Sequence, residues 1–542
     1  MLLKFLKNRA WIIILLLLGL WLLSEGISGW QYHAFRDDWF TLGYPNFWHG
    51  GSRWQFYRSY RLDSYRPLSF LVDIELLSRF WPHITIVAAM ILAFMFWSAM
   101  MWRQAFSRLW GLPFWGFVPL MLWLPLTDEG QYWITASVGI VLGLWFLGWA
   151  WLFLARFVQD QRSSLSRSLG WIAMTLAFLG ADLCYEQYWF SVIGLMAVIA
   201  LKYRRQWLPL LASPLLSLML TALWYLAHSS GMRANGKVAN HSLAAVMHSL
   251  HLILPQIAAI WGSEELDALK LGAHFGRVPG WWLILAVVLG LSTVFLAMMD
   301  YQNNHVDFAA VQSRLKGAAN SPAILILGGI IWTVASYLPW LMTHYDWVAD
   351  RSVTVCAPGI ALIGEAIVVY VGKTGWRPVR AGIVGVLTFL LVALLNLRAQ
   401  DIKAYNVANT FSAKLGNQVL SILNHHHLKG GSLTVADPTW TFAPWTYTYH
   451  DHISTAWDAN WGVLLMLADL SHGHNLYRVT ELWPQDPRHK APSFQNTGVI
   501  LTSARPSLIM VTRMHVHQAV VIQYQDLYPS PRIRRVKWYH LP

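Results

Sequence analysis

Two adjacent carboxylates, Asp37 and Asp38, lie in the aromatic-rich stretch HAFRDDWFTLGYPNFWHG, directly after the first strongly apolar segment of the chain. A positioned carboxylate can accept a proton from a hydroxyl group and act as a general base. Because acidic groups beside apolar segments cost desolvation energy, several of them together indicate a chemical use. The other acids in such short segments are Asp128 and Glu129 in LPLTDEGQYW, Glu186 in ADLCYEQYW, and Asp346 and Asp350 in MTHYDWVADRSVTVCAPG.

Arginines accompany these acids. Arg351 follows Asp350 directly, and Arg66 lies in SYRPLSFLVDIE, residues 64–75. A guanidinium group binds two phosphate oxygens at once and stays charged at any relevant pH, so both arginines are candidates for holding a phosphate. An arginine near a membrane can instead extend its charged end to the water, which is the alternative for Arg66. Further options for a phosphate contact are Arg53, Arg58 and Arg61.

The composition is that of a membrane protein. The 542-residue chain is 56% hydrophobic, and only 12% of its residues are charged. A water-soluble domain of this size could not cover so much apolar side chain with polar surface. The 33 tryptophans fit many crossings of the two membrane interfaces, where an indole ring is buried while its N–H still donates a hydrogen bond.

Apolar runs of the length that spans a hydrocarbon core predict about eleven transmembrane helices. The runs lie near residues 10–24, 82–102, 112–126, 133–155, 169–184, 187–201, 208–227, 281–299, 321–340, 352–371 and 381–397. Basic residues gather on alternate sides of these runs, which makes every basic loop and the N-terminus cytoplasmic. The formal charge of +13 therefore reports topology and attraction to anionic lipid rather than a nucleic-acid partner.

Two other segments complete this topology. Residues 242–262 are apolar but contain histidines and a proline, and a crossing there would place the basic loop at Lys373 outside. We therefore expect an interfacial or re-entrant segment. An odd number of crossings then leaves residues 398–542 outside, where helical periodicity at 402–424 and strand-like SLTVADPTW and QAVVIQYQ predict a small α/β domain. The domains expected are 1–397 and 398–542.

The histidines and cysteines suggest no specific chemistry. The His-rich pieces NHHHL, YHDH and SHGH lack definite ligand spacing, so we interpret them as surface histidines rather than a metal site. Cys184 and Cys356 lie beside apolar residues and are interpreted as small hydrophobic side chains.

The motifs containing the acids resemble those of a known family. FRDDWFTLGYPNFWHG, followed by SYRPLSFLVDIE, resembles the first-loop signature of the polytopic glycosyltransferases of the GT-C fold, in particular the transmembrane mannosyltransferases that end in tetratricopeptide repeats. TDEGQYWITAS is similar to their Thr-Glu motif, LCYEQYW to their Cys-Lys-Glu-Gln motif, and ADRSVTVCAPGIAL to their Glu-Arg motif. The resemblance runs in order over residues 30–370 and implies a GT-C-like membrane domain.

This chain also departs from the family pattern. Tyr185 stands where the family has lysine, Asp350 where it has glutamate, and CAPG where it has YLPS. No 34-residue helical period follows residue 398, so the repeats are absent. The donor sugar and the acceptor are therefore not implied by the resemblance.

What the resemblance does imply is a sugar donor on polyprenyl phosphate or diphosphate and a reaction on the exoplasmic face. The lipid phosphate is a good leaving group, whereas the acceptor hydroxyl must lose its proton, so a carboxylate base would contribute about 10²- to 10⁴-fold in rate. In related enzymes with Asp-Glu in the first loop, the first acid is catalytic, which assigns the base to Asp37. Asp38 would then orient the loop, bind an acceptor hydroxyl or contact a metal ion.

The function expected is thus the inverting transfer of a sugar to a glycan, lipid or protein hydroxyl by an integral protein of the bacterial inner membrane, with a periplasmic C-terminal domain. One alternative is a ligase that moves a whole oligosaccharide. A different class is a flippase or transporter, but transporters tend to place polar groups near the bilayer midplane in matched halves, whereas here the acids gather at one interface. No cofactor is assigned, and a divalent metal ion is left open.

Overall fold

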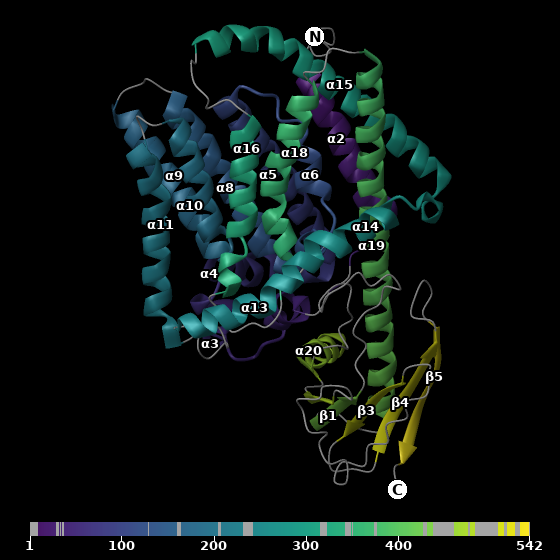
Figure 1. Cartoon of the computed structure of the whole chain (residues 1–542). Coiled ribbons are helices and arrows are strands. Elements are labelled where there is room, and N and C mark those ends of the chain that lie inside the picture. Colours follow the sequence, from purple (N-terminus) through teal and green to yellow (C-terminus); the bar gives the residue numbers. More distant parts are fainter. Residues whose placement is uncertain are drawn as a thin grey trace.

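The computed structural model describes residues 9–28, 32, 34, 37–127, 129–159, 164–203, 207–230, 242–314, 322–341, 348–349, 351–372, 377–425, 431–436, 460–474, 477–482, 508–513, 518–525 and 532–540. Figure 1 shows a bundle of long helices with a small β-sheet below it. One very long helix, α19 (Arg377–His425), runs from the bundle to the sheet.

Within the described residues, eight helical segments are long and apolar enough to cross a membrane. The chain is therefore an α-helical polytopic membrane protein, as its apolar runs predict. The eight segments lie in α5 (Ile84–Trp110), α8 (Ile134–Gln159), α11 (Trp207–Ala227), Leu243–Gly272, α15 (Gly280–Arg314), Pro322–Leu341, α18 (Arg351–Gly372) and α19. Other helices of the bundle are α2 (Arg9–Glu25), α9 (Ser164–Cys184) and α10 (Tyr188–Lys202).

The outer faces of the bundle are apolar. On α11, for example, Leu208, Leu215 and Leu223 are each at least half exposed, and they recur at a spacing that keeps them on one side of the helix. A contiguous surface of this kind would be unstable in water but is what the hydrocarbon core of a bilayer requires.

The apolar run at residues 112–126 differs from the expectation, because only the seven residues of α6 (Phe117–Trp123) are helical. Gly111 ends α5 with a φ of 70°, and prolines at positions 113 and 125 limit the helix on either side. A seven-residue helix is about 10 Å long, about a third of the hydrocarbon thickness. This run therefore packs as a short helix between α5 and α18 instead of forming a long one.

The doubtful segment at residues 242–262 forms α13 (Leu243–Ala259), which continues through the π-helical turn η8 (Ile260–Glu264) into α14 (Glu265–Gly272). Its length and composition would allow it to span a membrane. In Figure 1, however, α13 runs obliquely across the lower ends of α16 (Pro322–Ala335) and α18 rather than alongside them. This orientation is in keeping with the interfacial or re-entrant segment that the basic loops favour.

Helices α16 and α18 approach closely through two glycines. A Cβ atom added to Gly359 would lie 2.6 Å from the carbonyl oxygen of Gly329, and the reverse substitution would give 2.4 Å. Small residues at such crossings let membrane helices pack backbone to backbone. Because α18 begins with Arg351, this contact fixes the height and rotation of a candidate site residue.

Short helices between α2 and α8 form the end of the bundle that faces the sheet. Helix α3 (Arg53–Ser59) begins with a capping box in which the Ser52 hydroxyl accepts the Gln55 N–H, and the Gln55 side chain accepts the Ser52 N–H. The remaining short helices are η1 (Gly26–Ser28), η2 (Trp39–Gly43), η3 (Tyr44–Asn46), η4 (Leu62–Ser64), α4 (Pro67–Leu71), η5 (Val72–Leu76), η6 (Leu77–His83) and α7 (Glu129–Tyr132), with η9 (Phe275–Arg277) and α17 (Leu338–Leu341) later in the chain.

The described residues after α19 form five strands in the order β2-β1-β3-β4-β5 and one helix, α20 (Asn460–Leu470). β1 pairs in parallel with β2, whereas the other neighbours are antiparallel. The strands are β1 (Gly431–Ala436), β2 (Tyr477–Leu482), β3 (Leu508–Arg513), β4 (Gln518–Gln525) and β5 (Arg532–His540). The helical pattern at residues 402–424 belongs to α19, so the boundary expected at 397/398 falls inside one continuous helix.

Helix α20 packs directly on the first loop. It contacts η2 and α19, and Asp469 near its end accepts a 2.8 Å hydrogen bond from the Trp81 indole. The Trp81 ring in turn meets the edge of Trp39 at a centroid distance of 5.3 Å. The C-terminal part of the chain thus supports the loop that carries Asp37 and Asp38.

Candidate functional site

The two acids of the first loop have different surroundings. Asp38 is fully buried, and its Oδ1 accepts the backbone N–H and the hydroxyl of Thr135 at 2.8 and 2.7 Å. The Thr41 hydroxyl is hydrogen-bonded to the Thr135 hydroxyl, with 2.6 Å between the two oxygens. This bond connects η2 to the start of α8. Asp37 is partly exposed, and its backbone carbonyl accepts the N–H of Thr41. Asp38 therefore anchors the loop, and Asp37 is the acid of the pair that solvent reaches.

Arg66 forms a bidentate ion pair with Glu186. Its Nε and Nη2 donate to the two carboxylate oxygens at 2.7 and 2.5 Å, and the Tyr65 hydroxyl donates to the same carboxylate at 2.9 Å. The guanidinium carbon also lies 3.9 Å from the centre of the Tyr185 ring. Tyr185 thus stabilises the arginine through a cation–π contact.

The backbone at Arg66 is also unusual. Arg66 adopts left-handed angles, with φ of 50° and ψ of 54°, directly before Pro67 at the start of α4. A non-glycine residue in this region is strained and persists only where its surroundings hold it there. Here the ion pair with Glu186 supplies that constraint.

Arg351, the first residue of α18, pairs with Glu129, the first residue of α7. Its Nη1 donates to Glu129 Oε1 at 2.6 Å, and its backbone N–H donates to Oε2 at 2.9 Å. Glu129 is fully buried, whereas 14% of the Arg351 side chain is exposed. Gly130, which follows Glu129, leaves room for the Thr354 side chain. A Cβ atom added to Gly130 would lie only 2.2 Å from Thr354 Oγ1. The glycine thus lets α7 dock on α18.

Neighbouring residues join the two ion pairs. Gln187, which follows Glu186, donates to the hydroxyl of Ser352, which follows Arg351, at 3.0 Å. On the other side, Thr135 follows Glu129 closely in the chain, at the start of α8, and holds Asp38. The acids and arginines singled out in the sequence therefore gather from α4, α7, the α9–α10 turn, α18 and the first loop. In Figure 1, α4 and the start of α18 lie toward the end of the bundle that faces the sheet.

Not every candidate belongs to this cluster. Arg53 donates to Asn46 and Ser78, and Arg61 donates weakly to the Ser230 carbonyl at 3.4 Å, so both support local loops. Arg58 is exposed. Asp128 and Asp350, together with Asp346, lie outside the described residues.

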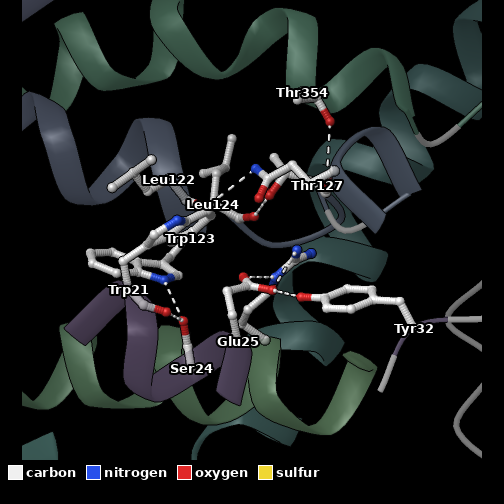
Figure 2. A network of polar contacts seen from close by, with 11 residues as sticks. Trp21, Ser24, Glu25, Tyr32, Leu122, Trp123, Leu124, Thr127 and Thr354 are labelled. Carbon is white, nitrogen blue, oxygen red and sulfur yellow. Dashed lines mark hydrogen bonds and ion pairs between the residues drawn. The ribbon is translucent and has the colours of Figure 1, made fainter. Parts of the chain in front are cut away.

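A second network, next to the cluster, is one the sequence did not indicate. Glu25 at the end of α2 accepts the Arg398 Nε at 2.8 Å and the Tyr32 hydroxyl at 3.2 Å (Figure 2). Both members of this ion pair are almost fully buried. The only sequence signal is an acid and an arginine, each at the end of an apolar run, and their separation hides the pairing.

The same network holds the segment that leads to Glu129. Trp123 donates to the Ser24 hydroxyl at 3.2 Å, and the Thr127 carbonyl accepts the Thr354 hydroxyl at 3.1 Å (Figure 2). A small cavity of about 10 Å³ lies between this segment and α19, lined by Trp123 to Thr127 and by Leu394, Leu397, Arg398 and Asp401. The segment that leads to Glu129 is thus held by α2 and α18.

Within the described residues, no three His, Cys, Asp or Glu side chains converge in a way that could hold a metal ion. The described histidines of the His-rich pieces, His425, His472 and His474, are all exposed.

Comparisons of the chain with protein-family models, with curated proteins and with solved structures find no match.

Proposed function

We propose that this protein is an integral membrane glycosyltransferase that moves a sugar from a polyprenyl-phosphate donor to an acceptor hydroxyl, with inversion. The observation that carries the proposal is that Arg66 and Arg351, from distant segments, each pair with a glutamate and are joined through Gln187 and Ser352. Asp37 lies next to Asp38, which Thr135 holds at the start of α8. A water-side acceptor and a membrane-held donor can meet only at an end of the helical bundle. The motifs that resemble the GT-C glycosyltransferases are the ones that build this cluster.

In the proposed reaction, Asp37 takes the proton of the acceptor hydroxyl as its oxygen attacks the anomeric carbon. The bond from that carbon to the phosphate oxygen breaks, and the lipid phosphate leaves with the electron pair. Arginines stabilise the negative charge that develops on the phosphate. Because the sugar is attacked on the side opposite the leaving group, its configuration inverts.

The two glutamates have a different role in this proposal. Glu129 and Glu186 are each engaged by an arginine at hydrogen-bond distance, which keeps a carboxylate ionised and makes it a weak base. They therefore orient the guanidinium groups, and Asp37, which is partly exposed, is the better base. An arginine already oriented loses less entropy when it meets a phosphate.

The finer topology is part of the same proposal. About eleven crossings would place the cluster and the strands after α19 on the exoplasmic face of a bacterial inner membrane, with the N-terminus in the cytoplasm. The long α19 supports this arrangement because it leads from the bundle to the sheet on the side where the cluster lies. A phosphatase reporter fused after Pro542 should be active, whereas a reporter that fluoresces only in the cytoplasm should stay dark.

The decisive experiment is mass spectrometry of lipid-linked sugars and envelope glycans in cells that lack this protein. We expect one polyprenyl-phosphate sugar to accumulate, and wild-type protein but not the Arg351→Ala variant to remove it. Accumulation of a whole oligosaccharide on the lipid would favour the ligase alternative. Unchanged pools of every lipid-linked sugar would contradict both.

A further inference from the structure

A third carboxyl group, that of Asp73, lies beside the first-loop acids and has no role in the proposed reaction. Asp73 belongs to η5 and to the sequence motif SYRPLSFLVDIE. It is fully buried, and within the described part of the chain neither of its carboxyl oxygens has a hydrogen-bond partner. Burying a charged carboxylate without hydrogen-bond donors costs much free energy. The charge of Asp73 must therefore be neutralised, either by a bound proton or by a cation.

The acid whose charge acts on Asp73 is Asp38, the residue directly before η2, and η2 packs against η5. Asp38 is equally buried, but the two donors of Thr135 hold its Oδ1 in the way that favours an ionised carboxylate. Burial and the negative charge of Asp38 both raise the pKa of Asp73 well above its ordinary value. Two charged carboxylates at one dry site repel each other, so such a pair titrates as a unit.

The cations on the surrounding elements have other partners. Arg66 before α4 pairs with Glu186, and Arg79 on η6 pairs with Glu75 at 3.5 Å. Arg53 on α3 donates to Asn46 and Ser78. The other titratable groups on the elements packed against η5 are Tyr57 and Arg58 on α3, Glu75 on η5 itself, His83 on η6 and Arg156 in the last turn of α8. The buried thiol of Cys184, at the end of α9, also senses the charge of Asp73.

We propose that Asp73 and Asp38 form one acid pair that binds a single proton, held on Asp73, and carries a single negative charge, held on Asp38. The neutral carboxyl of Asp73 lets η5 pack against η2 without charge repulsion, while Asp38 keeps the charge that binds Thr135. Asp73 is thus a positioning residue: through Asp38 it fixes the loop that presents Asp37. Only this last step rests on the proposed function.

Infrared spectroscopy of the full-length protein in nanodiscs tests the pair directly. A protonated carboxyl group has a C=O stretch separate from the carboxylate bands, and we expect a band of this kind in the wild-type protein at neutral pH that the Asp73→Asn variant lacks. Asp63→Asn is the matched control. Asp63 is half-buried rather than fully buried, so this variant should leave the band in place. Identical wild-type and Asp73→Asn spectra in this region would overturn the proposal.

Thermal unfolding gives a second measurement. Since the folded pKa of Asp73 is raised, its contribution to stability is present at low pH and lost as pH rises through that pKa. Asn stays neutral, so Asp73→Asn should lose less Tm than the wild type between about pH 5 and about pH 8. An equal loss of Tm in both proteins would contradict a protonated Asp73.

Adding Mg²⁺ or Mn²⁺ alone tests a metal ion as the alternative. A rise in the Tm of the wild type, but not of Asp73→Asn, would show that a metal ion takes the place of the proton and would overturn the proposal.

A further variant covers the case in which Asp73→Asn does not fold. In Asp38→Asn the neighbouring charge is removed, so the infrared band of Asp73 should titrate at a lower pH than in the wild type. An unchanged titration would overturn the pairing. These measurements need no sugar transfer, so they stand or fall separately from the proposed function. If that function holds, Asp73→Asn should keep turnover within about threefold, whereas Asp73→Ala, which leaves a cavity, should lower it more.

Discussion

Arg351 and Glu129 are 222 residues apart in the sequence, yet they form an ion pair of 2.6 Å in which each is the first residue of its helix. The same carboxylate accepts the backbone N–H of Arg351, so it also satisfies a free donor at the start of α18. One buried glutamate thereby sets the position of the guanidinium group and of the helix that carries it.

Replacing Arg351 tests the donor-binding role. Arg351→Ala should abolish or severely weaken donor binding, and Arg351→Lys should recover only part of it because a point charge cannot make a bidentate contact. Donor binding by purified variants measures this, with Arg79→Ala, an exposed arginine on η6, as the control. If the alanine variant binds donor normally, Arg351 serves only the start of α18.

The first-loop acids should separate in kinetics. Asp37→Asn keeps shape and hydrogen bonding but removes basicity, so turnover should fall by at least about 10²-fold with donor binding nearly intact. Asp38→Asn weakens the anchor to Thr135 and should cost less turnover but more thermal stability. Turnover rates and thermal melting curves of the two variants, measured in parallel, distinguish the two roles. Normal turnover in Asp37→Asn with an inactive but well-folded Asp38→Asn would reverse the two roles.

The contact of α20 with the first loop should depend on pH. Burial raises the pKa of Asp469 from 3.8 to about 6, although the hydrogen bond from Trp81 and the nearby His472 act in the opposite direction. The stability that this shift contributes is present below about pH 4 and is lost as pH rises through about 6. Limited proteolysis around α20 should therefore be faster at pH 8 than at pH 5 in the wild type.

In Asp469→Asn the difference between the two pH values should shrink, because the amide does not titrate. Asp267→Asn, at an exposed residue that pairs with Lys270, is the control and should behave as the wild type. A full pH difference in the Asp469→Asn variant would mean that another group controls the docking of α20.

The buried pair of Glu25 and Arg398 should matter for folding. Glu25→Gln leaves a buried guanidinium without its carboxylate, and removing one member of such a pair typically costs about 3–5 kcal/mol. The double variant Glu25→Leu with Arg398→Met should cost less, because no charge remains buried. Melting curves in detergent measure both, and Glu75→Gln in the exposed pair with Arg79 should change stability by less than about 1 kcal/mol. A double variant less stable than Glu25→Gln would contradict this account.

The membrane class and the position of most helices could be predicted because hydrocarbon thickness fixes the length of an apolar run. The exception is the run at 112–126, where Gly111, Pro113 and Pro125 limit the helix to seven residues despite an apolar composition. The same argument did not reveal that α19 continues past residue 397, because a helix that leaves the bilayer loses its apolar character but not its hydrogen bonds.

For the site, the sequence indicated which residues gather but not how they pair. The motifs brought Arg66, Glu129, Glu186 and Arg351 together as candidates, whereas the assignment of each glutamate to one arginine depends on the packing of helices far apart in sequence. The burial of Asp73 could not be predicted either, because the sequence pattern around a single acid in an amphipathic motif is the same whether the acid is exposed or buried.

The pair between Glu25 and Arg398 also has a consequence for how the chain is made. The two residues are 373 positions apart, so at the usual rate of synthesis Glu25 waits roughly 20 to 75 s for its partner to leave the ribosome. During that interval the first helix ends in an acid without this partner. A chain that stops before residue 398 cannot form the pair and should therefore pack less stably than the full chain.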